Sequence, residues 1–190
     1  MKKQIRILGI DDGPFTFKDS KTILIGTIMR GGSYLECVLR KYISIDGTDA
    51  TKICSEMITS TRFYKQLKTI MIDGVTLGGF NVLDINQLYD ITNIPIITIT
   101  RDKPDLRKIK SALQNHLPNW QDRYLILTQG KLHKLITPHN PIYIKYIGLS
   151  IEEAKDIINL STIRGVIPEP LRIAHLIASG ISKGESYGKA

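Results

Sequence analysis

Three apolar segments of the chain each end in an aspartate followed by a glycine. These segments are residues 7–13, 42–47 and 70–74. A β-branched run that closes on Asp-Gly is typical of a strand ending in a tight turn, with the carboxylate at the strand's carboxyl end. A single such ending is ordinary turn chemistry. Three of them place Asp11, Asp46 and Asp73 at strand ends, and carboxylates that converge need a cation to offset their repulsion.

The first three predicted strands form an antiparallel meander. They cover residues 4–11, 21–30 and 33–46. Gly31-Gly32 predicts a hairpin between the second and third strands, because such turns require positive φ. Residues 12–20 are too few for a crossover helix, so the first two strands are expected to be antiparallel as well.

A crossover follows the meander. Ile53, Met57 and Ile58 recur at helical spacing within residues 48–63, and a strand is predicted over residues 68–73. A strand-helix-strand crossover makes this strand parallel to the third strand, and hence to the first. The three aspartates are therefore expected at one edge of the sheet, the edge at which open α/β sheets place their sites.

The rest of the chain continues the alternation of helices and strands. Helices are predicted over residues 84–92, 104–116, 150–160 and 168–182, and strands over residues 94–100, 124–128 and 141–147. Ser150 is the expected cap of one helix and Gly184 the stop of the last. The pattern predicts a mixed α/β sheet, an antiparallel three-stranded meander followed by parallel strands, flanked by helices.

Composition favours one soluble domain over residues 1–190. The chain has 42% hydrophobic residues and no linker, repeat or low-complexity tract. Its apolar runs are shorter than the ~20 residues that span a bilayer, and its start lacks the apolar stretch of a signal peptide. Cys37 and Cys54 form no CxxC pair. We therefore expect a cytoplasmic protein with no membrane partner.

The charge balance favours a polyanion as partner. Lys and Arg number 26 against 18 acidic residues, which gives a net charge of +8. Five cations cluster around the predicted helix 104–116. They are Arg101, Lys103, Arg107, Lys108 and Lys110. This group either contacts the phosphates of a nucleic acid or forms an ordinary solvated helix face.

The aspartate edge suits Mg²⁺ or Mn²⁺. Mg²⁺ prefers oxygen ligands and is commonly held by a few carboxylates plus water, and two such ions about 4 Å apart can catalyse phosphodiester cleavage. Asp11 and Asp73 are the main candidates, Asp46 is the third, and Asp12 and Asp49 are reserves. The alternative is that each Asp-Gly pair only makes a turn.

The segment Ile167-Pro168-Glu169-Pro170-Leu171-Arg172-Ile173-Ala174-His175 opens the last predicted helix. Glu169 suits the first turn of a helix, and Arg172 lies three residues further on. His175 falls on the apolar stripe of this helix. It is either a satisfied core histidine or, if the helix packs on the aspartate edge, a member of the site. No Walker loop, GxSxG or HExxH motif is present.

These residues resemble the endonuclease V superfamily of ribonuclease H-like folds, and more closely an uncharacterised endonuclease-V-like family. The likeness spans nearly the whole chain. Its carriers are Leu8-Gly9-Ile10-Asp11, Met71-Ile72-Asp73-Gly74, Gly148-Leu149-Ser150 and the segment ending in His175. In the superfamily both aspartates bind metal, and the last position completes the metal site.

The chain also departs from endonuclease V. That enzyme carries a Tyr-Ile-Pro wedge and a catalytic glutamate, and residues 33–46 contain neither a proline nor a matching glutamate. Asp46 is the nearest acidic replacement. Residues 76–81 replace a His-Pro-Arg stretch, and Arg101 stands where the enzyme has a lysine. Recognition of deaminated purines is therefore not expected to carry over.

The resemblance implies a Mg²⁺-dependent nuclease acting on DNA or RNA. Asp11, Asp73 and Asp46 would hold the metal, and His175 would be a ligand or orient the attacking water. The cations that would hold the nucleic-acid backbone are Arg101, Lys103, Arg107, Lys108 and Arg172. Two alternatives remain open. One is a nucleic-acid-binding module without cleavage, and the other is a metal-dependent hydrolase of a small phosphorylated metabolite.

Overall fold

The structure, a computed structural model, describes residues 4–16 and 18–186. Residues 1–3, at the start of the chain for which no signal peptide is predicted, lie outside the described residues. The strands are β1 (Arg6–Asp12), β2 (Lys21–Arg30), β3 (Tyr34–Ser44), β4 (Leu67–Asp73), β5 (Thr76–Leu77), β6 (Asn81–Val82), β7 (Ile96–Thr100), β8 (His133–Leu135) and β9 (Ile142–Ile147). The helices are α1 (Ala50–Ser60), α2 (Ile85–Thr92), α3 (Leu106–His116), α4 (Trp120–Thr128), α5 (Ile151–Ser161) and α6 (Glu169–Lys183), with a 3₁₀ turn, η1 (Tyr64–Gln66).

Seven strands form one mixed sheet in the order β3-β2-β1-β4-β7-β9-β8. The β1–β2–β3 meander is antiparallel, and β4 and β7 run parallel to β1, as predicted. The two last strands are antiparallel to their neighbours. Gly31 has a φ of 58° in the β2–β3 turn, which explains the first glycine of the pair.

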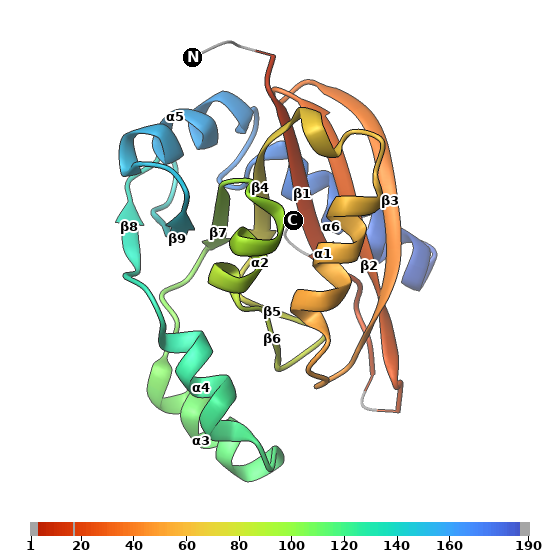
Figure 1. Cartoon of the computed structure of the whole chain (residues 1–190), viewed down its shortest axis with the longest axis vertical. Helices are drawn as coiled ribbons and strands as arrows, with labels where there is room; N and C mark the ends of the chain where they lie inside the picture. The colour runs from red at the N-terminus through yellow and green to blue at the C-terminus, as the bar shows by residue number, and fades with distance from the viewer. Residues whose placement is uncertain (1–3, 17, 187–190) are drawn as a thin grey trace.

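Helices cover both faces of the sheet (Figure 1). One apolar cluster joins alternate residues of β1, β2 and β4, such as Leu8 and Ile70, to α1 and α2. A second cluster joins the opposite face, including Ile7 and Met71, to α5 and the start of α6. Successive side chains of a strand point to opposite faces of the sheet. Because helices cover both faces, the buried strands carry apolar side chains on both. This explains the continuous apolar runs in the sequence.

Helix α6 lies very close to β1. A Cβ atom on Gly9 would collide with the carbonyl group and Cβ of Pro170, and the hydroxyl of Thr27 donates a hydrogen bond of 2.6 Å to the Pro170 carbonyl. Only glycine permits this approach of helix to strand. Leu171 and Ala174 of α6 are buried, and Gly184 ends the helix with a φ of 81°.

One predicted strand is wrong. Residues 124–128 lie in helix α4, with Arg123 and Leu127 as its buried residues. The run Tyr-Leu-Ile-Leu-Thr has the composition of a strand. Leu127, however, is buried together with Arg123 four residues earlier, which is helical spacing, and an arginine is not expected at a buried position. The strands β5, β6 and β8 were not predicted, since each is only two or three residues long.

Helices α3 and α4 form a hairpin that extends from the carboxyl edge of the sheet (Figure 1). Its two helices contact each other, and α4 reaches β6. Asp105 caps α3 by accepting hydrogen bonds from the backbone N–H groups of Arg107 and Lys108. The hairpin thus stands at the same edge as the ends of β1 and β4.

We expect Gly9→Ala to destabilise the protein by about 1–3 kcal/mol, because the added methyl group must push Pro170 and α6 away from β1. Chemical denaturation measures the change. Gly180→Ala, in α6, is the control, since a Cβ there meets nothing closer than 3.4 Å. The control should be neutral or stabilising by up to about 1 kcal/mol. Equal losses in both variants would contradict this account.

Candidate active site at the carboxyl edge

Asp11 and Asp73 lie on neighbouring parallel strands, one residue beyond the paired residues Ile10 and Ile72. Both side chains are on the α6 face of the sheet, because each stands two residues after one packed on that face, Gly9 or Met71. Asp11 is 5% exposed. The structure therefore brings together the two carboxylates that the sequence favoured.

His175 contacts this pair from α6. Its Nδ1 lies 3.0 Å from Oδ2 of Asp11. This hydrogen bond, aided by the charges of Asp11 and Asp73, raises the pKa of His175 above its usual value, against the effect of burial. Nε2 of His175 is buried and has no hydrogen-bond partner within the described residues. His175 therefore lies against Asp11 with one ring nitrogen left without a partner among the described residues.

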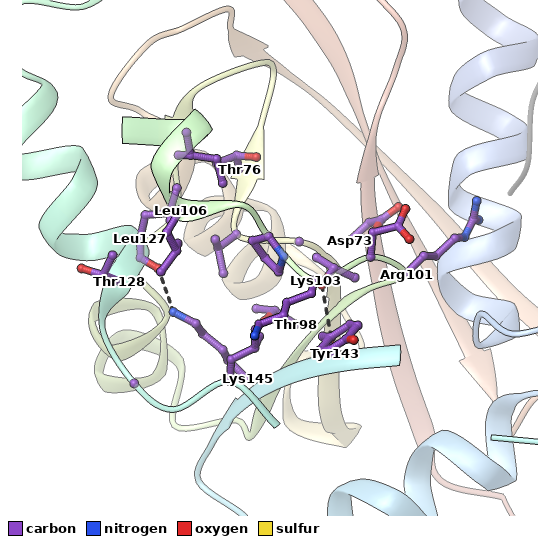
Figure 2. Close-up of a pocket in the computed structure, with 18 residues that line it drawn as sticks. Asp73, Thr76, Thr98, Arg101, Lys103, Leu106, Leu127, Thr128, Tyr143 and Lys145 are labelled. Carbon is purple, nitrogen blue, oxygen red and sulfur yellow. Dashed lines mark hydrogen bonds between the residues drawn. The ribbon is translucent and has the colours of Figure 1, made fainter. Parts of the chain in front are cut away.

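The charges around Asp73 are unequal. Burial and the negative charge of Asp11 raise the pKa of Asp73, while Arg101 and His175 act in the opposite direction. Figure 2 shows Asp73 and Arg101 close together at one end of a pocket. The charge of Asp11 thus disfavours the ionisation of Asp73, and a bound cation would remove that penalty.

Asp12 is a third carboxylate at the site, on the other face of β1. Its Oδ2 accepts a hydrogen bond of 3.0 Å from the backbone N–H of Gly78. Burial, followed by the charge of Asp11, raises the pKa of Asp12 to about 7. The sequence makes Asp12 only a reserve candidate, because the Asp-Asp pair leaves open which carboxylate faces which side of the strand.

Asp46 does not join Asp11 and Asp73. Asp46 follows β3, an edge strand of the sheet that β2 separates from β1, so the end of β3 lies about 10 Å to the side of β1. Oδ1 of Asp46 accepts a hydrogen bond of 2.7 Å from the N–H of Phe80. The expected convergence of three aspartates is thus corrected to two, because a shared edge does not imply adjacent strands.

Asp49, the other reserve, has a structural role near the start of α1. Its carboxylate accepts hydrogen bonds from the hydroxyl of Ser44 and the side-chain amide of Asn81. These bonds, working against burial, lower the pKa of Asp49. In the described part of the chain, no group of three or more His, Cys, Asp or Glu side chains could hold a metal ion.

Two carboxylates still fit Mg²⁺. This ion keeps several waters and is usually bound by one or two carboxylates together with substrate phosphates. Asp11 and Asp73 supply that number from adjacent strands. Nε2 of His175 points at no protein partner in the described residues. The donor set therefore fits a divalent cation that leaves positions open for water and substrate.

A pocket of about 690 Å³ adjoins Asp73. Its walls come from β4, β7, β9 and the α3–α4 hairpin, and Figure 2 shows Lys145 opposite Asp73 and Arg101. Nζ of Lys145 donates a hydrogen bond of 2.7 Å to the carbonyl of Leu127. Lysine and threonine side chains on mostly apolar walls are typical of a ligand pocket. No sequence pattern predicts this pocket, because its walls come from separate segments of the chain.

The predicted basic residues separate into two groups. Arg101 and Lys103 line the pocket, and Arg107 and Lys108 are exposed on α3. Arg172 is instead paired with the buried carboxylate of Glu169, through Nε and Nη2 hydrogen bonds of 3.0 and 2.6 Å. This pairing raises the pKa of Arg172 and offsets its charge. Arg172 therefore lies outside the basic group formed by the other four.

The fold and site define a ribonuclease H-like protein with a carboxylate pair at the carboxyl edge of its sheet. A structure of Ciona intestinalis endonuclease V, in complex with a DNA that contains an inosine followed by a ribo-adenosine, shares the fold. Its TM-score is 0.61 at 12% identity, covering 92% of this chain and 84% of that one. The predicted fold class is thereby confirmed.

The endonuclease dU family model matches residues 3–182, and the chain belongs to this family. A UPF0215 protein of Methanosarcina mazei is 49% identical, covering 100% of this chain and 97% of that protein. A crystal structure of an Archaeoglobus fulgidus protein of unknown function has a TM-score of 0.84 at 41% identity, covering 94% of this chain and 98% of that one. The predicted relationship to an endonuclease-V-like family is confirmed.

The raised pKa of Asp12 predicts a pH-dependent stability. An unfolded Asp12 titrates near 3.8 and a folded one near 7, so folding is favoured by protonation and stability falls as pH rises through this window. Asp12→Asn keeps an acceptor for the N–H of Gly78 and removes the charge. It should therefore raise the free energy of unfolding at pH 8 by up to about 4 kcal/mol and change it little at pH 4.

Urea denaturation in EDTA at both pH values measures this effect. Asp90→Asn, an exposed position on α2, is the matched control and should be neutral at both. A stability gain for Asp12→Asn that is the same at pH 4 and pH 8 would rule out the buried charge as its cause.

Proposed function

We propose that the protein is a divalent-metal-dependent nuclease that cleaves phosphodiester bonds in DNA or RNA. The observation that carries this proposal is the pairing of Asp11 and Asp73 on adjacent strands, with His175 bonded to Asp11 and its Nε2 without a protein partner in the described residues. Membership in the endonuclease dU family supports it.

Asp11 and Asp73 would hold Mg²⁺ or Mn²⁺, which supplies an activated water and stabilises the developing charge on the phosphate and leaving oxygen. Asp11 also orients His175, because its Oδ2 fixes Nδ1 of the ring and so directs Nε2. Nε2 would accept a proton from the attacking water or hold it in place. Asp46, occupied by the Phe80 N–H, stays outside this constellation.

The substrate strand would lie along the pocket and the basic residues beside it. Arg101 and Lys103 stand next to Asp73, and Arg107 and Lys108 extend the positive surface along α3. Such cations contact phosphates and position a strand without reading its bases. In the described residues no helix is both long and apolar enough to cross a bilayer. We propose a cytoplasmic location, because the two unpaired cysteines favour a reducing compartment.

We expect purified protein to nick labelled DNA or RNA strands in Mg²⁺ or Mn²⁺ and to be inactive in EDTA. Because the family name contains dU, the panel includes deoxyuridine-containing strands beside inosine-containing and unmodified ones. Asp11→Asn and Asp73→Asn should abolish cleavage, since each removes one of two carboxylate ligands. His175→Ala should lower the rate by about 10- to 100-fold. Gel analysis of end-labelled products measures these effects.

Asp90→Asn is the control for the loss of a carboxylate far from the site. If no strand is cleaved while binding is tight and salt-sensitive, the nuclease proposal fails and a binding module is selected. Turnover of a small soluble phosphoester without polymer binding would select a metabolite hydrolase instead.

The exposed cations of α3 should govern the salt dependence of binding. Arg107→Gln and Lys108→Gln are each expected to reduce the slope of log K against log [salt] by about 0.7–0.9, because each removes one phosphate contact. Fluorescence anisotropy with a labelled strand in EDTA measures the slope. Lys52→Gln, on exposed α1 surface, is the control and should leave the slope unchanged. Unchanged slopes in all three variants would remove α3 from the binding surface.

A further inference from the structure

The α3–α4 hairpin, residues 106–128, is attached to the rest of the molecule by few apolar contacts. Its buried residues are Leu113 on α3, and Arg123 and Leu127 on α4. The three apolar clusters of the described structure contain no residue of either helix. Polar contacts must therefore fix the hairpin in its place beside the pocket, where Leu106, Ile109 and Leu127 form one wall.

Arg123 provides most of these contacts. Its guanidinium donates hydrogen bonds to the carbonyls of Asp46 and Gly47, each at 2.8 Å, and to the carbonyl of Phe80. Within the hairpin itself, its Nε also donates to the side chain of Asn119 at 2.9 Å. The residue is 6% exposed. A planar group with five donors can join two separate loops in a fixed geometry, whereas an ammonium offers three donors on a flexible stem.

The loops that Arg123 joins also hold the carboxylates. The N–H of Phe80 donates to Oδ1 of Asp46, and the N–H of Asp46 donates to the carbonyl of Gly78 at 2.8 Å. The N–H of Gly78 donates to Oδ2 of Asp12. Finally, the N–H of Asp12 donates to Oδ1 of Asp11 at 2.9 Å. A continuous chain of hydrogen bonds thus runs from α4 to the residue that contacts His175.

The 78–80 loop leaves this chain little freedom. Gly78 and Gly79 have φ values of 57° and 82°, in the left-handed region that side chains rarely adopt. A Cβ on Gly79 would lie 2.5 Å from Oδ1 of Asp46. The surrounding hydrogen bonds therefore hold the loop in an unfavourable backbone conformation, and the loss of one of these bonds would favour its opening.

We propose that Arg123 is a positioning residue that makes the place of the α3–α4 hairpin and the geometry of Asp12 and Asp11 depend on each other. When the hairpin is docked, Arg123 holds the 46–47 and 78–80 loops together, and Gly78 holds Asp12. When the loop opens, the hairpin loses its main polar attachment. The functional part rests on the proposed metal site: a strand gripped by α3 and a metal at Asp11 would then stabilise the same arrangement.

Hydrogen exchange tests the coupling from the α4 side. Arg123→Met removes all four donated hydrogen bonds at similar volume, and Arg123→Lys is the milder variant for the case that the first does not fold. We expect amides of residues 76–82 to exchange at least about tenfold faster, together with those of residues 106–128, while the β1 and β4 amides stay protected. Arg62→Met, an exposed cation after α1, is the matched control and should change neither region.

A reciprocal variant tests the coupling from the loop side. Gly79→Ala should open the loop, because the new methyl group meets Asp46 in a backbone conformation that alanine resists. Trp120, the single tryptophan of the chain, lies on α4 one turn before Arg123, so its fluorescence reports on the hairpin. We expect a shift of the Trp120 emission in Gly79→Ala that resembles the shift in Arg123→Met. Faster exchange at 76–82 with unchanged Trp120 emission would overturn the coupling.

Binding of Mn²⁺ alone links the coupling to the site. In Arg123→Met we expect the Mn²⁺ affinity, measured by calorimetry, to fall at least about threefold, and Arg62→Met to match the wild type. An unchanged affinity with faster loop exchange would show that Arg123 only supports structure, and it would overturn the positioning role. If the wild type itself binds no Mn²⁺, the proposed metal site fails, and the exchange and fluorescence results still decide the coupling.

Discussion

The approach of α6 to β1 at Gly9 is the constraint on which the site depends. Where a helix packs on a sheet, side chains on the strands normally fill the space between the two. Here the strand offers only a hydrogen atom opposite Pro170, and the hydroxyl of Thr27 binds the Pro170 carbonyl. The start of α6 is therefore fixed against the centre of the sheet. One and a half turns later, this places the His175 ring within hydrogen-bond distance of Asp11.

The same packing makes the site electrostatically costly. Burial and the negative charge of Asp11 raise the pKa of both Asp12 and Asp73. His175 and Arg101 supply partial compensation. A protein selected for stability alone would replace such carboxylates with apolar residues. Clustered buried acids with opposing neighbours are instead typical of a functional site.

Much of this arrangement could be predicted from local patterns. Strand ends at Asp11 and Asp73, the hairpin at Gly31 and the helix that carries His175 all follow from residues close in sequence. The resemblance to endonuclease V then indicated that α6 packs on the aspartate edge. Sequence order could not show that β4 inserts beside β1 rather than β3, and this lateral order separates Asp46 from the other two carboxylates.

Arg123 shows why the remainder was out of reach. A helix is recognised in a sequence by the regular spacing of its apolar residues, and a buried arginine interrupts that spacing. Residues 124–128 therefore predict a strand although they lie in α4. The partners of Arg123 are backbone carbonyls, which every residue has and no sequence pattern marks. Gly78 and Gly79 can be read from the sequence, but what requires glycine there cannot. The loop must bond to Asp12 on one side and to Asp46 on the other, in a backbone conformation that favours glycine. Residues that position a site through backbone contacts leave almost no signature in one sequence, so the structure is needed to find them.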